Sequence, residues 1–297
     1  MFRGYSTAHC SLELPDYHPF PKYKYAGVAQ ALQGEMEVLE APAIGWETLA
    51  LVHERAYLEK LRREGLSRQE AHRVGLPWTR SLLTRALHAA GGTLAATRDA
   101  LRWGLGMNLA GGTHHAYRDR AEGYCLFNDV AVAVAALRAE GWGGRVLVAD
   151  LDAHQGNGTA VIFQDNPSVF TLSVHAERNY PLKKEQSDLD VGLPDATGDA
   201  EYLAALEPAL EQAFASRPEL VFFNAGVDVL AGDRFGRLGL SLEGLAERDR
   251  RVLERVRRAG VPLVIVMGGG YNRDPGTTVA AHAQTYRLAL ERLAGSL

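Results

Sequence analysis

The chain has 297 residues, 46% of them hydrophobic, so it is long enough to bury a large core. Its formal net charge is −4, from 32 Lys and Arg against 36 Asp and Glu, and no run of five or more basic residues occurs. This charge pattern disfavours direct nucleic-acid binding.

Cysteine content and hydropathy disfavour two further classes of protein. Cys10 and Cys125 are far apart and form no Cys-x-x-Cys pair, which argues against a disulfide framework or a cysteine metal site. Cys125 is expected to be a small buried hydrophobic residue. The first residues lack a charged segment followed by an apolar run, and a stretch of about 18 apolar residues occurs nowhere. We therefore expect a cytoplasmic protein that neither enters nor crosses a membrane.

Short apolar runs alternate with stretches of helical spacing along the chain. The pattern predicts, in order, a helix over 81–103, a strand over 105–110, a helix over 129–140, strands over 145–150 and 168–174, a helix over 200–215, a strand over 220–225, a helix over 242–259, a strand over 262–267 and a helix over 277–293. Residues 179–198 are polar and irregular, which predicts a long surface loop near the strand ends. Alternating strands and helices indicate an α/β fold with a largely parallel sheet, here as a single domain over 1–297.

Four of the predicted strands run directly into acids, histidines and glycines. These segments are 111–116 (GGTHHA), 150–158 (DLDAHQGNG), 226–233 (GVDVLAGD) and 268–271 (GGGY). Taken singly, each has a structural explanation as a cap, a turn or a buried polar pair. Open parallel sheets bind ligands at the carboxyl ends of their strands, so four such clusters at one edge favour a catalytic site.

The second of these segments has the chemistry of a metal site. Asp150, Asp152 and His154 alternate, so in an extended segment their side chains point the same way. Asp-x-His with one further carboxylate suits a catalytic zinc, with iron(II), cobalt or manganese as alternatives. The third ligand is either Asp228 or Asp233, and the spacing does not choose between them.

The order of these motifs resembles that of the histone deacetylase family. The segments that carry the resemblance are 18–20 (HPF), 114–115 (HH), 123–129 (GYCLFND), 150–154 (DLDAH), 226–228 (GVD) and 268–271 (GGGY). The version at 150–158 is most similar to the class IV deacetylases and their bacterial relatives, because class I members carry an aspartate where Asn157 stands. The resemblance implies the arginase/deacetylase fold and a zinc-dependent amidohydrolase that removes an acyl group from acyl-lysine or a related acylated amine.

The resemblance also implies a set of metal ligands and two potassium sites. Zinc, or iron(II) in its place, is expected on Asp152, His154 and Asp228, which leaves Asp233 as a nearby acid. One potassium site is expected around Asp150, Asp152, His154 and Ser173, and a second around Phe163, Asn166 and Val169.

The remaining site residues receive catalytic roles from the same resemblance. His115 is expected to accept the proton of the attacking water and later to protonate the departing amine. His114 is expected to be a charged imidazolium oriented by Asp150, whereas the neutral Asn157 keeps His115 neutral near pH 7. Tyr271 is expected to donate its hydroxyl to the developing oxyanion.

The walls of the substrate pocket follow the family pattern only in part. Gly123 and Tyr124 are expected to line a tunnel for acyl-lysine, with Phe235 on the opposite wall. Tyr124 replaces the usual phenylalanine, and 179–181 (NYP) replaces the usual aromatic and Pro-Gly loop. The adjacent glycines of the last motif, Gly269 and Gly270, are expected at the same pocket beside Tyr271.

Three other functions fit the same residues. The first is hydrolysis of an acetylpolyamine or another small amide, and the second is arginase-like chemistry on two manganese ions, which needs additional bridging carboxylates. The third, from another class, is a module that binds acyl-lysine or a metabolite without turning it over. The oligomeric state is not determined by the sequence.

Overall fold

A computed structural model describes residues 2–15 and 17–293, so the outermost residues of the expected domain, 1 and 294–297, lie outside the described chain. Its centre is an eight-stranded sheet in the order β2-β1-β3-β8-β7-β4-β5-β6, and every neighbouring pair is parallel. The strands are β1 (Arg3–Ser6), β2 (Glu37–Glu40), β3 (Leu105–Asn108), β4 (Val146–Asp150), β5 (Val169–Ala176), β6 (Leu189–Leu193), β7 (Leu220–Asn224) and β8 (Leu263–Val266).

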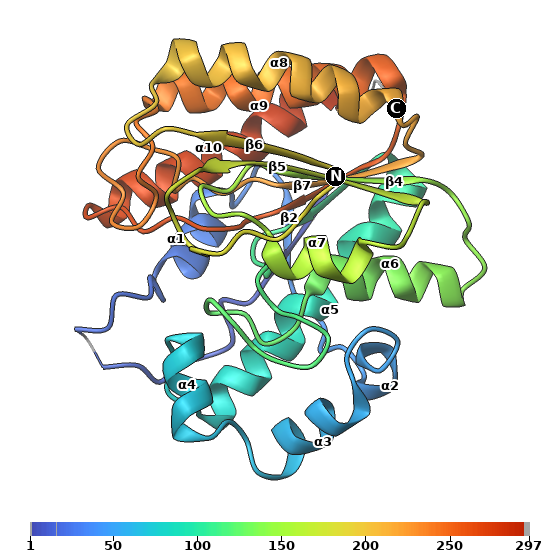
Figure 1. The fold of residues 1–297 in the computed structure, drawn as a ribbon, viewed down its shortest axis with the longest axis vertical. Coiled ribbons are helices and arrows are strands. Elements are labelled where there is room, and N and C mark those ends of the chain that lie inside the picture. The colour runs from blue at the N-terminus through green and yellow to red at the C-terminus, as the bar shows by residue number, and fades with distance from the viewer. Residues whose placement is uncertain (1, 16, 294–297) are drawn as a thin grey trace.

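Helices cover both faces of the sheet. They are α1 (Lys24–Ala31), α2 (Trp46–Leu49), α3 (Arg55–Arg63), α4 (Arg68–Val74), α5 (Arg80–Trp103), α6 (Asp129–Ala139), α7 (Asn157–Phe163), α8 (Asp199–Ala215), α9 (Leu242–Ala259) and α10 (Pro275–Leu293). Figure 1 shows α1, α8, α9 and α10 on one face and α5, α6 and α7 on the other, with α2, α3 and α4 forming a lobe beyond α5. Across the described ranges, no helix combines the length and apolarity needed to cross a membrane.

The predicted α/β architecture is confirmed, and every predicted helix and strand is present with small shifts in its bounds. The central strands β4, β7 and β8 are buried along their whole length because helices cover both faces, which explains their continuous apolar runs. Local signals set the helix ends as well. The Thr79 side chain caps α5 by accepting from the Leu82 N–H, and Gly104, at φ 84°, ends that helix in a left-handed conformation.

The prediction of one long loop over 179–198 was wrong in its second half. Strand β6 lies within that segment and pairs in parallel with β5 at the edge of the sheet. An edge strand with one covered face alternates exposed and buried residues, so its composition is polar and resembles that of a loop. The sequence pattern did not predict β1, β2, the first four helices or α7.

Candidate active site

The carboxyl ends of four central strands meet at one edge of the sheet. Asp150 at the end of β4 pairs with Ser173 of β5 on one side and with Asn224 of β7 on the other. Strand β8 follows β7, and β3 follows β8. The loops after these strands therefore leave the sheet together, which brings the four polar segments of the sequence into one site.

Three candidate metal ligands converge in this site. The ligand atoms of Asp152, His154 and Asp228 all lie within 4.8 Å of one another. His154 Nδ1 lies 3.0 Å from Asp152 Oδ1 and 2.9 Å from Asp228 Oδ2. Residues 151–156 form a loop between β4 and α7, so this turn and not an extended strand brings the side chains together.

The donor set fits a divalent cation. Burial, followed by the charge of Asp152, raises the pKa of Asp228 to about 7, so the two carboxylates repel each other in this environment. A divalent cation would offset that repulsion, and two carboxylates with one imidazole are oxygen and nitrogen ligands that zinc accepts. The residues present therefore fit the metal that the family resemblance implies.

Asp233 has a different environment from Asp228. Its carboxylate accepts hydrogen bonds from the backbone N–H groups of Phe235, Gly236 and Tyr271, at 2.9, 3.1 and 2.6 Å. These bonds occupy both of its oxygens and tie the loop after β7 to the loop after β8. The structure thus brings Asp228, and not Asp233, to the other two ligands.

A second group of three potential ligands occurs in the described part of the chain, in the segment after β1 and on α5. It consists of His9, Cys10 and His88. The ring nitrogen Nδ1 of His88 lies 2.6 Å from the carbonyl oxygen of Ala41. Because a carbonyl oxygen only accepts, that nitrogen carries a proton and is not free to bind a metal.

His114 is paired with the carboxylate of Asp150. Its Nδ1 lies 2.7 Å from Asp150 Oδ2, and Asn224 donates to the other oxygen of that carboxylate at 2.9 Å. Burial lowers the pKa of His114, but the charges of Asp150 and Asp152 outweigh this effect and raise the pKa to about 9. His114 is therefore protonated near neutral pH.

His115 lies beside His114, but its pKa is shifted in the opposite direction. Its Nδ1 donates to the amide oxygen of Asn157 at 2.6 Å, and the two histidine rings are 4.0 Å apart between centroids. Burial, followed by the charges of His114 and His154, holds the pKa of His115 well below its usual range. The ring is neutral, so its Nε2 atom keeps a lone pair that can accept a proton.

The glycines of the last motif allow the chain to approach the metal ligands closely. The Gly269 N–H donates to Asp152 Oδ2 at 2.7 Å, and a Cβ at Gly269 would collide with the carboxylate of Asp228. Gly269 lines the pocket, whereas a Cβ at Gly270 would meet Val227 and His282. That Gly270 contacts substrate stays a prediction.

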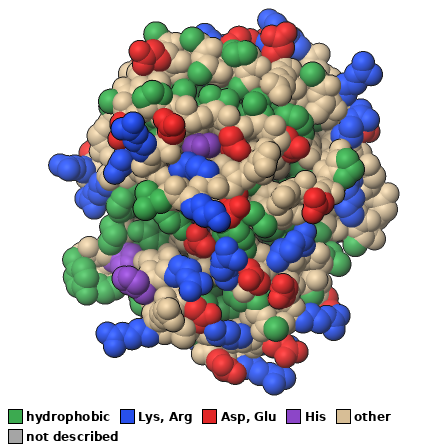
Figure 2. Space-filling view, in the orientation of Figure 1, with side chains coloured by type: hydrophobic (Ala, Val, Ile, Leu, Met, Phe, Trp, Pro, Cys, Tyr) green, Lys and Arg blue, Asp and Glu red, His purple; other side chains and the backbone are tan. Residues whose placement is uncertain are grey.

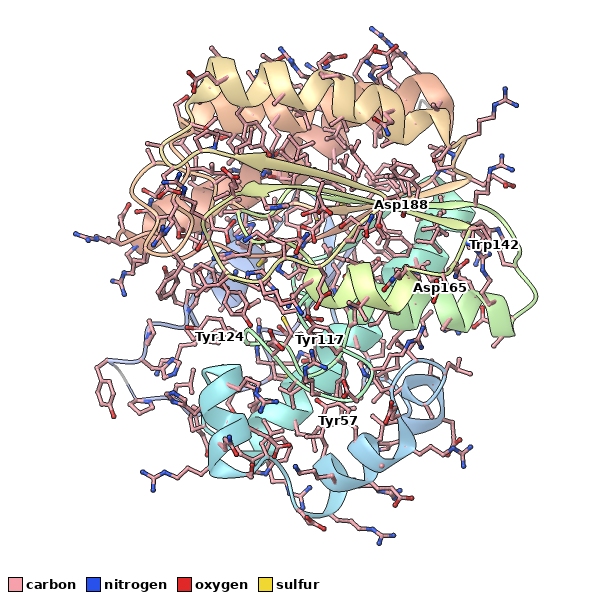
Figure 3. The ribbon with its side chains drawn as sticks, viewed as in Figure 1. Tyr57, Tyr117, Tyr124, Trp142, Asp165 and Asp188 are labelled. Atoms are coloured by element: carbon pink, nitrogen blue, oxygen red, sulfur yellow. The ribbon has the colours of Figure 1, made fainter. Side chains whose placement is uncertain are left out.

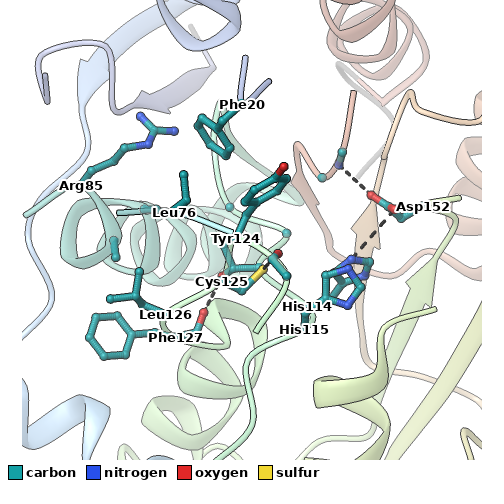
Figure 4. Close-up of a pocket in the computed structure, with 18 of the residues that line it drawn as sticks. Phe20, Leu76, Arg85, His114, His115, Tyr124, Cys125, Leu126, Phe127 and Asp152 are labelled. Carbon is teal, nitrogen blue, oxygen red and sulfur yellow. Dashed lines mark hydrogen bonds and ion pairs between the residues drawn. The ribbon is translucent and has the colours of Figure 1, made fainter. Parts of the chain in front are cut away.

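The pocket consists of an inner and an outer chamber that meet at the catalytic groups. Both chambers are lined by His115, Gly123, Tyr124, His154 and Tyr271. Figure 4 shows the inner chamber, with His114 and His115 close to Asp152 and with Phe20 beside Tyr124. The expected tunnel residues are thus brought to the site, and Cys125, buried as expected, also lines the inner chamber.

The outer chamber contains the expected opposite wall. The Phe235 ring packs against Tyr271 with centroids 5.2 Å apart, and the Tyr271 ring lies 6.0 Å from that of Tyr124. Gly123 has a φ of 50°, and a Cβ there would collide with His115, so the motif requires glycine at this point.

Several side chains of the site were not identified from the sequence. The ring of Tyr180 packs against His115 at 5.0 Å, in the loop that departs from the family pattern. Lys24 of α1 donates to the Gly268 carbonyl at 2.8 Å and lies 5.4 Å from the Tyr271 ring centroid. The only signal for Lys24 was its proximity in sequence to the 18–20 motif, and these contacts depend on long-range packing.

The residues expected around potassium also lie near one another. Asp150 and Ser173 are register partners on β4 and β5, and Ser173 Oγ lies 2.9 Å from His175 Nδ1. At the second expected site, the carbonyl oxygens of Phe163 and Asn166 accept from backbone N–H groups within the turn after α7.

Comparison with known proteins identifies the family. A model of the histone deacetylase domain matches residues 18–286. An uncharacterised protein of Picosynechococcus sp. is 41% identical over 286 residues, which cover 93% of this chain and 94% of that protein. Histone deacetylase 2 of Arabidopsis thaliana is 32% identical, with 89% of this chain and 72% of that protein covered.

Solved structures agree with the sequence matches. The crystal structure of an HDAC homologue complexed with SAHA has a TM-score of 0.80 and 26% identity, and the match covers 97% of this chain and 83% of that chain. An HDAC homologue from Aquifex aeolicus has a TM-score of 0.79 and 25% identity over the same shares. The chain therefore belongs to the histone deacetylase family and has its arginase/deacetylase fold.

Proposed function

We propose that this protein is a metal-dependent deacylase that hydrolyses the amide of acyl-lysine or a related acylated amine, through one domain over 1–297. One observation carries the proposal. Asp152 and His154, which cluster with Asp228, line a pocket together with the neutral ring of His115 and with Tyr271. Amide hydrolysis needs an activated water, a base and an oxyanion donor, and these residues supply the protein groups for all three.

The chemistry can be followed through the side chains of the chain. A zinc or iron(II) ion on Asp152, His154 and Asp228 would polarise the acyl carbonyl and lower the pKa of a water molecule toward about 7. His115 accepts the proton of the attacking water at Nε2 and returns it to the nitrogen of the departing amine. Tyr271 donates its hydroxyl hydrogen to the developing oxyanion, since burial raises the pKa of this hydroxyl well above its usual range and keeps it protonated.

His114 and Asp150 support this step by electrostatics. The protonated ring of His114 lies next to His115 and places a positive charge near the developing oxyanion. Asp150 holds that charge in position with its 2.7 Å contact. We also propose potassium near Asp150 and Ser173, where it would stabilise the loop that carries the ligands.

The charge at the pocket mouth favours acyl-lysine over an acetylpolyamine. Arg73, Arg234 and Arg237 line the outer chamber, and none of its lining residues in the described chain is Asp or Glu. Among carboxylates of the described residues, these three arginines have one partner, Asp195, which lies 3.2 Å from Arg237. A polyamine cation would meet like charge here, whereas a neutral or acidic peptide would not.

The absence of direct nucleic-acid binding stays a prediction from the charge pattern of the sequence. On the face shown in Figure 2, Lys and Arg side chains are interspersed with Asp and Glu. The cytoplasmic location expected from the sequence stays a prediction.

Turnover assays test the proposal. Release of the carboxylic acid would be measured from acetyl-, butyryl- and longer acyl-lysine peptides and from acetylpolyamines, with zinc-loaded, iron-loaded and chelated protein in parallel. We expect metal-dependent release from the peptides and slower release from the polyamines. Metal-loaded protein that binds an acyl-lysine peptide without turnover at any acyl length would instead support the non-catalytic binding module.

A further inference from the structure

We propose that Glu122, together with Tyr117, fixes the orientation of the Asn157 amide and thereby the position of the proton on His115. Glu122 is then a positioning residue that acts on the general base through another side chain. The inference rests on the proposed function, in which His115 accepts the water proton.

An amide at position 157 can adopt two orientations, and only one of them leaves a lone pair on His115 Nε2. A carboxylate at position 157 could only accept, so His115 Nδ1 would have to carry the ring proton. An amide presents an oxygen on one side and an NH2 group on the other, and a flip exchanges them. With the NH2 group toward His115, the proton would move to Nε2, and that nitrogen could no longer accept one.

The surroundings of the Asn157 amide permit one orientation. Asn157 is 1% exposed, and its Oδ1 accepts from His115 Nδ1 at 2.6 Å. On its other side, Nδ2 donates to the Tyr117 hydroxyl at 3.0 Å and to Glu122 Oε1 at 3.3 Å. The carboxylate of Glu122 can only accept, and the hydroxyl of Tyr117 donates to Glu185 Oε1 at 3.1 Å, so it also presents a lone pair to the amide.

A flipped amide would keep a hydrogen bond to His115, with the ring proton on Nε2, but it would lose its bond to Glu122, and the Tyr117 hydroxyl could donate to it only by giving up Glu185. The oxygen of the flipped amide would face the partly buried carboxylate of Glu122, and the two acceptors would repel each other. The cost of an unsatisfied buried polar group favours the observed orientation by about 5- to 150-fold.

Glu122 is itself held in place from two sides. Tyr180 donates its hydroxyl to Oε1 at 2.8 Å, and Arg120 Nε donates to Oε2 at 3.4 Å. Tyr117 and Tyr180 belong to two different loops, and Figure 3 shows Tyr117 between the sheet and the lower helices. The carboxylate thus links both loops to the amide beside the base.

Kinetics of single and double variants test this role. We expect Glu122→Ala to lower kcat about 10- to 100-fold on an acetyl-lysine peptide, with KM little changed, as for other residues that orient a catalytic group through a hydrogen bond. Asp119→Ala is the matched control, because Asp119 is an exposed carboxylate on the same loop that pairs with Arg120 and does not contact Asn157. This control should keep the kcat of the unaltered protein.

Asn157→Asp separates the proposed role from a purely structural one. In that background the group at 157 can only accept, so adding Glu122→Ala should no longer lower kcat and should raise it by removing a like charge. If Glu122 served only to hold Tyr180 or the loop, the loss caused by Glu122→Ala would persist in the Asn157→Asp background, and the proposal would be wrong.

A spectroscopic measurement does not depend on turnover. The ¹⁵N shifts of the His115 ring, assigned from the signal lost in His115→Asn, distinguish a proton on Nδ1 from one on Nε2. We expect Nδ1–H in the unaltered protein and a mixture in Glu122→Ala, with or without zinc. A proton on Nδ1 in both proteins would overturn the inference. If the unaltered protein shows no turnover but the Nδ1 proton is lost in Glu122→Ala, the inference would be supported and only the proposed function would be contradicted.

Discussion

The buried guanidinium of Arg248 donates through Nη1 to the carbonyl oxygen of Gly226 at 2.6 Å. The same nitrogen donates to the carbonyl of Leu151 at 3.1 Å, so one side chain of α9 joins the loop after β4 to the loop after β7. Asp152 follows Leu151 directly, and Asp228 lies two residues after Gly226. A side chain beneath the site therefore sets the separation of the two loops that carry the candidate metal ligands.

Replacing this side chain should affect both stability and metal binding. Arg248→Met leaves the buried carboxylate of Asp249, which Arg248 contacts at 2.9 Å, without its charged partner. Breaking a buried pair in this way costs about 3 to 5 kcal/mol in the free energy of unfolding. We expect that loss in urea unfolding, together with weaker zinc affinity, and a smaller loss in Arg248→Lys. Equal zinc affinity in the folded Arg248→Met protein would contradict the link to the ligands.

The two acids of the segment 226–233 should behave differently toward metal. Asp228→Ala removes a ligand and should abolish tight zinc binding, whereas Asp233→Asn should retain about one zinc per chain because Asp233 serves the backbone of the neighbouring loop. Elemental analysis after dialysis measures both. A content near two metals per chain in the unaltered protein would instead favour the binuclear alternative.

Tyr271→Phe should separate catalysis from binding. The change removes the proposed oxyanion donor and keeps the ring that packs against Phe235. Loss of one such donor costs about 2.7 to 4 kcal/mol, so kcat should fall by about 10²- to 10³-fold while the zinc content stays constant. Steady-state kinetics on an acetyl-lysine peptide provide the measurement, and an unchanged kcat would remove Tyr271 from the mechanism.

The His114–Asp150 pair should make stability depend on pH in metal-free protein. Burial lowers the pKa of His114, but the carboxylates of Asp150 and Asp152 outweigh it and raise the folded-state pKa to about 9, against about 6.5 in an unfolded chain. The stabilisation is therefore complete below about pH 6.5 and is lost as the pH rises through about 9. We expect His114→Gln to lower the free energy of unfolding more at about pH 6 than at about pH 10. An equal loss at both values would show that His114 is not charged.

The sequence determined the central architecture because burial on both faces leaves a strong local signal. Strands β4, β7 and β8 are continuous apolar runs, and the predicted bounds differ from the observed ones by few residues. The edge of the sheet left no such signal. Strand β6 alternates polar and apolar residues within a polar segment, so only its pairing with β5 distinguishes it from a loop.

In the candidate site, too, the sequence predicted one part and the folded structure determined the rest. The chain order of the motifs was sufficient to identify the family and to bring His114, His115, Asp152 and His154 to one edge of the sheet, because parallel strands end together. Nothing in the spacing chose Asp228 over Asp233, since that choice depends on which carboxylate the loop turns toward the other ligands and which one toward backbone N–H groups.

Only the tertiary structure decided the surroundings of the catalytic groups. Glu122, Tyr180 and Arg248 are ordinary polar residues in the sequence, and each reaches the site through contacts between distant segments. Periodicity and motif spacing report local conformation and strand order. Some hydrogen bonds orient a base, fix the orientation of an amide or keep two loops at a given separation. These bonds depend on the packing of side chains from different elements, and that packing is formed only when the chain folds.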